Sequence, residues 1–145
     1  MHGRVNKLGV PSFVFSREEF IAGVPILEKL AEYDVCLIVL AGFMNKISDV
    51  ILQAFPGKIV NIHPALLPKY GGKGMYGMHV HEAVVKAGER ESGITIHYIN
   101  EHYDEGAIIF QASCPVLPSD TPEEVAWKVH ALEYAHYPHV IESLL

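Results

Sequence analysis

Short runs of hydrophobic residues alternate along the chain with stretches whose hydrophobic positions repeat at helical spacing. Residues 35–40 are wholly apolar, and residues 58–62 predict the next strand. An uninterrupted apolar run such as residues 35–40 is typical of a buried strand in a parallel sheet that is covered on both faces. Residues 12–15 predict another short strand, and residues 94–99 and 107–111 predict the two strands of a late hairpin.

Helix-start signals separate these strands. Ser16-Arg17-Glu18-Glu19 and Thr121-Pro122-Glu123-Glu124 both read as capping boxes, in which a hydroxyl and a glutamate satisfy free backbone N–H groups. Gly23 and Pro25 interrupt the first helix, so a second helix is predicted at residues 24–33. Further helices are predicted at residues 48–55, with Ser48 as the cap, and at residues 79–87. The last helix begins at residue 122, and Pro138 is expected to kink or break it.

This order of elements predicts one α/β domain over residues 1–145, with a mostly parallel sheet, helices on both faces and a late β-hairpin. In such folds the first strand and a Gly-rich turn usually open the domain and bind phosphate. No such turn follows a strand near the start, where residues 4–8 read as the end of a helix. We therefore expect the first strand of the fold to be missing.

Composition narrows the classes of function. The net charge is −6 and lysines and arginines are scattered, which argues against a nucleic-acid surface. No apolar run is long enough to cross a membrane, and no signal-peptide pattern opens the chain, so a cytoplasmic location is expected. Cys36 and Cys114 share no metal-like spacing and lie in apolar stretches, so both are expected to be reduced core residues.

The end of the second predicted strand carries the first candidate chemistry. Asn61-Ile62-His63-Pro64 lies at the edge where open α/β sheets place their ligands, and residues 63–77 form a long loop rich in glycine and proline. Asn61 can donate a hydrogen bond, and His63 can exchange a proton near neutral pH. For an arbitrary strand end, the plainer alternative is that these side chains only satisfy nearby backbone groups.

Other polar residues are weaker candidates on their own. Asp104 is a good turn residue before Gly106, although beside His63 it would orient the imidazole. Glu133, on the last helix, reads as a solvated residue when taken alone. Several histidines invite a test for a metal site, but no HExxH pattern or cysteine cluster supports one, so no metal is predicted. These histidines are His63, His79, His81, His97 and His102.

Four segments taken together resemble the glycinamide ribonucleotide formyltransferase family over essentially the whole chain. They are LAGFM at residues 40–44, NIHPALLPKY at residues 61–70, SGITIHY at residues 92–98 and DEGAIIFQA at residues 104–112. The second segment is the most specific. Methionyl-tRNA formyltransferases and formyltetrahydrofolate deformylases carry similar Asn-x-His and Asp-Glu-Gly motifs but differ around the Leu-Leu-Pro-Lys segment.

The resemblance implies a Rossmann-like formyltransferase fold, and it implies transfer of a formyl group from 10-formyltetrahydrofolate to the amine of glycinamide ribonucleotide, in purine biosynthesis. It implies a catalytic trio of Asn61, His63 and Asp104. The folate-binding positions that it implies are Leu40, Met44, Asn45, Lys46, Ile47, Asn61, Glu101, Tyr103 and Asp104. The substrate-binding positions that it implies are Arg17, Gly42, Lys69, Gly71 and Glu133.

The family pattern begins with a strand and a Gly-Ser-Gly-type loop for the ribonucleotide phosphate, and this part has no match here. We therefore expect this chain to lack activity, to self-associate through the face left by the missing segment, or to be a fragment. Two alternatives to the formyltransferase stay open: a formyltetrahydrofolate hydrolase that uses the same trio with water, and an inactive folate-binding fragment.

Overall fold

The computed structural model describes residues 7–43, 45–100 and 106–145, and its strands form one open sheet in the order β1–β2–β3–β4. β1 (Ile38–Leu40) pairs in parallel with β2 (Ile59–His63). β3 (Glu91–Tyr98) is antiparallel to β2, and β4 (Ile108–Pro115) is antiparallel to β3. The predicted α/β fold and late hairpin are confirmed.

The described sheet is mixed, so the prediction that it is mostly parallel was wrong. His63 at the end of β2 pairs with Thr95 in the middle of β3, and Val60 near the start of β2 pairs with Tyr98 at the end of β3. The chain therefore enters β3 at the edge where it left β2, and the two strands run in opposite directions.

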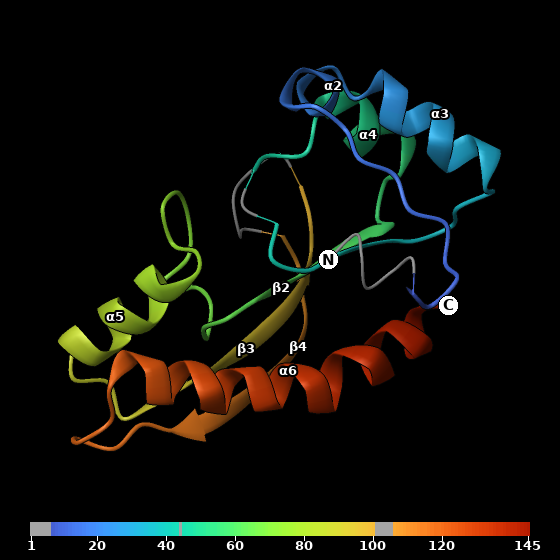
Figure 1. Ribbon diagram of the computed structural model, residues 1–145. Coiled ribbons are helices and arrows are strands. Elements are labelled where there is room, and N and C mark those ends of the chain that lie inside the picture. The colour runs from blue at the N-terminus through green and yellow to red at the C-terminus, as the bar shows by residue number, and fades with distance from the viewer. Residues whose placement is uncertain (1–6, 44, 101–105) are drawn as a thin grey trace.

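Helices cover both faces of this sheet. They are α2 (Arg17–Ala22), α3 (Val24–Glu32), α4 (Asp49–Ala54), α5 (Met78–Lys86) and α6 (Pro122–Leu144). Ile59 belongs to a hydrophobic cluster with residues of α3 and α4, and Ile62 to a cluster with residues of α5 and α6. Because these residues are three apart on one strand, the clusters lie on opposite faces of the sheet. Figure 1 shows α5 and α6 beside β3 and β4, apart from the group of α2, α3 and α4.

Local signals place the N-terminal helices. The Ser16 hydroxyl accepts from the Glu19 N–H, and the Glu19 carboxylate accepts from the Ser16 N–H, so the capping box is formed. Gly23 ends α2 and begins α3 at a φ of 78°. This left-handed conformation suits glycine, and an added Cβ would lie 2.1 Å from the Ser48 hydroxyl oxygen.

Three local predictions were wrong. Residues 12–15 form no strand, and Phe13 instead packs its ring on Tyr33 and under the Lys29 ammonium group. Ser48 precedes α4 but makes no side-chain cap bond. β1 is shorter than predicted and is not covered on both faces, because Val39 is 40% exposed at the edge of the described sheet.

The last helix runs through Pro138 without breaking. Pro138 is exposed, so water can hydrate the Tyr134 carbonyl that the missing N–H leaves unbonded. One residue earlier, buried Tyr137 donates its hydroxyl to the Leu40 carbonyl at 2.6 Å. This bond ties α6 to the end of β1.

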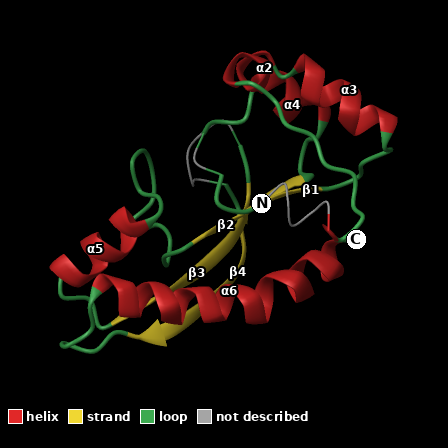
Figure 2. Ribbon diagram, viewed as in Figure 1, coloured by secondary structure: helices red, strands yellow, loops and turns green. Residues whose placement is uncertain are grey.

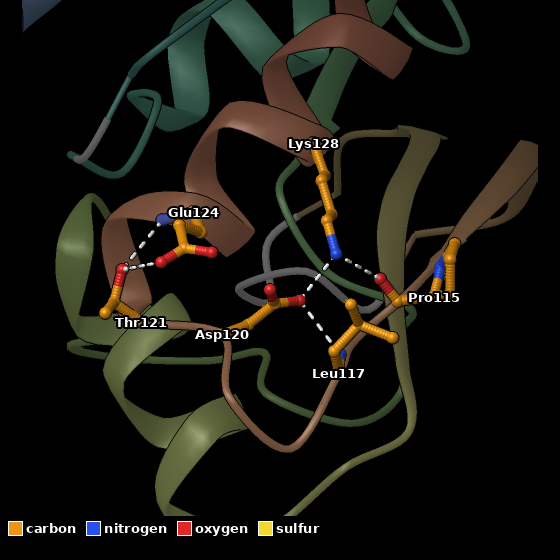
Figure 3. A network of polar contacts seen from close by, with 6 residues as sticks. All are labelled: Pro115, Leu117, Asp120, Thr121, Glu124 and Lys128. Carbon is orange, nitrogen blue, oxygen red and sulfur yellow. Dashed lines mark hydrogen bonds and ion pairs between the residues drawn. The ribbon is translucent and has the colours of Figure 1, made fainter.

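The start of α6 is held by a polar network (Figure 3). The Thr121 hydroxyl accepts from the Glu124 N–H at 3.2 Å and caps the helix. Buried Asp120 accepts from the Leu117 N–H at 2.8 Å and from the Lys128 ammonium group. Lys128 also donates to the Pro115 carbonyl, so this network joins the end of β4 to the first turns of α6.

Candidate active site

β2 carries Asn61 and His63 into the interior of the protein. All five residues of the strand are buried because β2 lies between β1 and β3. Asn61 pairs with Leu40 on β1 and with His97 on β3. The exposed fraction of Asn61 is 8% and that of His63 is 3%. The strand-end residues singled out from the sequence are therefore desolvated, and their polar atoms need partners.

A cavity of about 620 Å³ opens at this end of the sheet. Its wall comes from the ends of β1 and β2, the loop before α5, and one face of α6. Figure 2 shows the connection from β2 to α5 as one long loop. The sequence-predicted residues that line the cavity are Leu40, Gly42, Asn45, Lys46, Ile47, Asn61, His63 and Glu133. Residues that are scattered along the chain thus meet in one cavity.

His63 is held by the loop that follows it. Its Nε2 lies 2.7 Å from the carbonyl oxygen of Tyr70. A carbonyl oxygen can only accept a hydrogen bond, so Nε2 must carry the proton. The neutral form of His63 is therefore the Nε2–H tautomer, and Nδ1 is the nitrogen at which a proton can be gained or lost.

The buried hydroxyl of Thr95 also holds this loop through hydrogen bonds to its backbone. Thr95, which is fully buried on β3, donates to the Ala65 carbonyl at 2.7 Å and accepts from the Leu67 N–H at 3.0 Å. Gln111 on β4 donates to both the Thr95 hydroxyl and the Leu67 carbonyl. These bonds tie the residues after His63 to the β3–β4 hairpin.

Two buried polar atoms of cavity residues have no partner among the described residues. They are Oδ1 of Asn61 and Nδ1 of His81. Buried polar groups in native proteins are nearly always hydrogen-bonded, to protein, water or ligand. Unpartnered atoms in a cavity wall therefore favour a site for a polar ligand.

His81 and His130 form an aromatic pair in this wall, with ring centroids 6.4 Å apart. Burial, and then the charges of His130 and His63, lower the pKa of His81 to about 4. His81 is therefore neutral at physiological pH.

Comparison with known proteins gives this cavity a context. A family model described as "Formyl transferase" matches residues 2–141, which is nearly the whole chain. The chain belongs to the formyl transferase family. Within this family it is 39% identical to phosphoribosylglycinamide formyltransferase from Bacillus subtilis, over 98% of this chain and 72% of that protein. It is 42% identical to the chloroplastic phosphoribosylglycinamide formyltransferase from Arabidopsis thaliana, over 94% of this chain.

Solved structures of the family share the fold. The crystal structure of phosphoribosylglycinamide formyltransferase from Streptococcus pneumoniae superimposes with a TM-score of 0.88 at 36% identity, over 98% of this chain and 78% of that one. The predicted Rossmann-like formyltransferase fold is thereby confirmed. The chain spans 48% of the length of the Arabidopsis protein.

Some residues that the family resemblance assigned lie away from the cavity wall. Arg17 is an exposed residue of α2 and does not line it. Lys69 points to Glu89, with 3.4 Å between its Nζ and the carboxylate oxygen Oε1, and Gly71 precedes the part of the loop that lines the cavity. Met44, Glu101, Tyr103 and Asp104 lie outside the described residues. The roles of all these residues stay predictions.

The cavity wall also contains residues that no sequence motif had marked as part of a site. They are Phe43, Ile62, Pro64, Lys73, Met75, Tyr76, Met78, His81, Ile99, Asn100, His130 and the glycines Gly72, Gly74 and Gly77. From the sequence, His81 is a candidate only for a metal site. Its place beside Val80 and Val84 on the buried face of α5 is the signal that could have marked it as an interior residue.

The expectation for the two cysteines can be compared with the structure. Cys36 is exposed and only Cys114 is partly buried, so the expectation that both are core residues was wrong for Cys36, although both thiols are free. Over residues 7–43, 45–100 and 106–145, no group of three or more potential metal ligands occurs. No helix in the described part of the chain is long and apolar enough to cross a membrane.

Proposed function

We propose that this chain carries the catalytic centre of a phosphoribosylglycinamide formyltransferase, which transfers a formyl group from 10-formyltetrahydrofolate to the amine of glycinamide ribonucleotide in purine biosynthesis. One observation carries the proposal. In a chain of this family, Asn61 and His63 are buried at the end of β2 and line the same cavity as Glu133.

The reaction needs the groups that this cavity contains. The substrate amine attacks the formyl carbon, and the carbonyl electron pair moves to oxygen, which gives a tetrahedral intermediate with an oxyanion. Asn61 donates its side-chain N–H to that oxyanion, an interaction worth about 3 kcal/mol in the barrier. The intermediate collapses by breaking its bond to N10 of the folate. Formylated amine and tetrahydrofolate are the products.

Protons must move in step with these bonds. The attacking amine loses one proton and N10 gains one, so the net reaction neither consumes nor releases a proton. His63 takes part through Nδ1, because its Nε2 donates to the Tyr70 carbonyl. Asp104 is proposed to orient His63, on the family resemblance.

The cavity lining contains both apolar and polar groups. Leu40, Ile47 and Ile99 supply apolar surface that suits a flat pteridine ring. Glu133 is the one carboxylate among the described lining residues, and we propose that it accepts a hydrogen bond from the substrate amine. Asn45 and Lys46 lie near Ile47 and are proposed folate contacts. Arg17, Lys69 and Gly71 are proposed nucleotide contacts on the resemblance alone.

The test is formyl transfer by the purified protein, with 10-formyldideazafolate as donor and glycinamide ribonucleotide as acceptor. We expect His63→Ala to lower kcat by about a hundredfold or more. His139→Ala is the matched control, because His139 is an exposed residue of α6 outside the cavity and its loss should leave kcat unchanged.

Three outcomes would overturn the proposal. Formate release without the acceptor amine would favour a formyltetrahydrofolate hydrolase. Binding of the folate analogue by calorimetry without any transfer would mean a folate site with no working acceptor site. Undiminished transfer by His63→Ala would remove His63 from the mechanism.

Two accompanying expectations also stay predictions. The sequence favours a cytoplasmic location, whereas the name of the Arabidopsis relative places that protein in the chloroplast. Self-association through the face left by the segment missing from the family pattern is expected, and exposed apolar side chains support it, among them Ile21 of α2, Val24 of α3 and Val39 of β1. Sedimentation velocity over a range of protein concentrations would test it.

A further inference from the structure

Tyr70 has a backbone conformation that needs support. Its φ is 57°, in the left-handed region that non-glycine residues seldom adopt. The carbonyl of this same residue is the acceptor for Nε2 of His63. Whatever holds Tyr70 in this conformation therefore also sets the direction of the bond to His63.

The side chain of Tyr70 supplies that support. Its ring packs against the hydrophobic cluster between the sheet and α6. Its hydroxyl donates to Oε1 of Glu89 at 2.9 Å. Glu89 lies in the turn between α5 and β3, nineteen residues further along the chain. Lys69 approaches the same carboxylate oxygen at 3.4 Å from a more exposed position.

The charge states make the direction of this bond unambiguous. Burial, and then the hydrogen bond to Glu89, raise the pKa of Tyr70. The hydrogen bond from Tyr70, together with Lys69, lowers the pKa of Glu89. At neutral pH the tyrosine is thus a protonated donor and the glutamate an ionised acceptor.

We propose that Glu89 and the Tyr70 hydroxyl are positioning groups for His63. They hold the Tyr70 carbonyl where it keeps His63 in the Nε2–H tautomer, which reserves Nδ1 for proton transfer. The inference rests on the formyltransferase function proposed above. Neither residue lines the cavity, so both act through His63 and not on the substrate.

Three variants separate the hydrogen bond from its surroundings. Tyr70→Phe removes the donor and keeps the ring. Glu89→Leu removes the acceptor, whereas Glu89→Gln removes the charge and keeps an oxygen that can accept from Tyr70. Glu91→Leu is the control, because Glu91 is an exposed residue only two positions away.

We expect kcat to fall about tenfold or more in Tyr70→Phe and Glu89→Leu, with both KM values within about twofold of the wild type, because misplacing a catalytic group affects the chemical step most. Glu89→Gln should recover most of the lost activity. Long-range ¹H–¹⁵N NMR should show His63 as the Nε2–H tautomer in the wild type and as a tautomer mixture in the two damaging variants.

The NMR readout keeps this inference separate from the proposed function. If the wild type transfers no formyl group, the function fails, yet the tautomer shift still tests the positioning role. The positioning role is wrong if the His63 tautomer is unchanged in both Tyr70→Phe and Glu89→Leu, whatever happens to kcat. It is also wrong if Glu89→Gln is as inactive as Glu89→Leu.

Discussion

Replacing Thr95 with valine should weaken the support of the loop that carries His63. Valine has nearly the same shape as threonine but no hydroxyl, so the change removes three hydrogen bonds without leaving a cavity. The Leu67 N–H and the Ala65 carbonyl then lose the partner that the hydroxyl provided. Ala65 is fully buried and Leu67 is 6% exposed, so water cannot easily replace it.

The expected size follows from these two backbone groups. An unsatisfied buried donor or acceptor costs about 1–3 kcal/mol, so the pair costs about 4 kcal/mol. The Gln111 amide loses only one of its two hydrogen bonds, because it still donates to the Leu67 carbonyl, so its contribution to the cost is smaller. Since a domain is stabilised by about 5–15 kcal/mol in total, this single oxygen accounts for a large part of the free energy of unfolding.

Urea unfolding followed by circular dichroism measures the effect. Tryptophan fluorescence is a poor probe here, because Trp127 is 82% exposed in the native state. Thr95→Ser is the matched control, since it keeps the hydroxyl and loses one methyl group, at a cost of about 1 kcal/mol. The reasoning fails if Thr95→Val is as stable as Thr95→Ser or more stable.

Two further predictions concern pH. The folded pKa of His81, about 4, lies below its ordinary value of 6.5, so the unfolded state takes up a proton first as the pH falls. Stability should therefore drop by up to about 3 kcal/mol between pH 6.5 and 4, and His81→Asn should show a flatter profile in urea unfolding at several pH values. The prediction would be contradicted if the free energy of unfolding changed with pH equally in the wild type and in His81→Asn. The hydrogen bond from Lys128 holds the pKa of Asp120 below its ordinary 3.8, so Asp120 stabilises the fold above that pH and loses this effect in acid. Asp120→Asn should accordingly lower Tm at pH 7, and calorimetry should find a smaller difference near pH 3; a difference independent of pH would show that the charge has no role.

Much of the fold could be predicted because its signals are local. The Ser16 and Thr121 caps each act over three residues. The box at Ser16 forms in full, whereas at Thr121 the hydroxyl caps the helix and also donates to the Glu124 carboxylate, so only the first half of the predicted box is seen there. Gly23 separates α2 from α3 because its left-handed backbone conformation, with a φ of 78°, cannot continue a helix. The segment at residues 12–15 shows the limit of such signals. It is apolar enough for a strand, but a strand also needs a neighbour, and Phe13 packs on α3 instead.

The candidate site could be predicted in part. Asn61 and His63 were found because they end a buried strand at a sheet edge, where ligands usually bind. His130 and the Tyr70–Glu89 pair were not assigned to it, since nothing in their own neighbourhood of the chain marks them. The role of Thr95 could not be predicted for the same reason, because its hydroxyl forms hydrogen bonds with Leu67 and Ala65, which are 28 and 30 positions away in the sequence.

Hydrophobic spacing, caps and turns in the sequence were enough to place most helices and strands and to single out the strand end that lines the candidate site. These signals act within a few residues of the chain. The three-dimensional structure was needed to show that β3 runs opposite to β2, that α5 and α6 complete the cavity, and which nitrogen of His63 holds the proton. Each of these depends on contacts between distant parts of the chain, and packing and buried hydrogen bonds select them only when the whole domain is assembled.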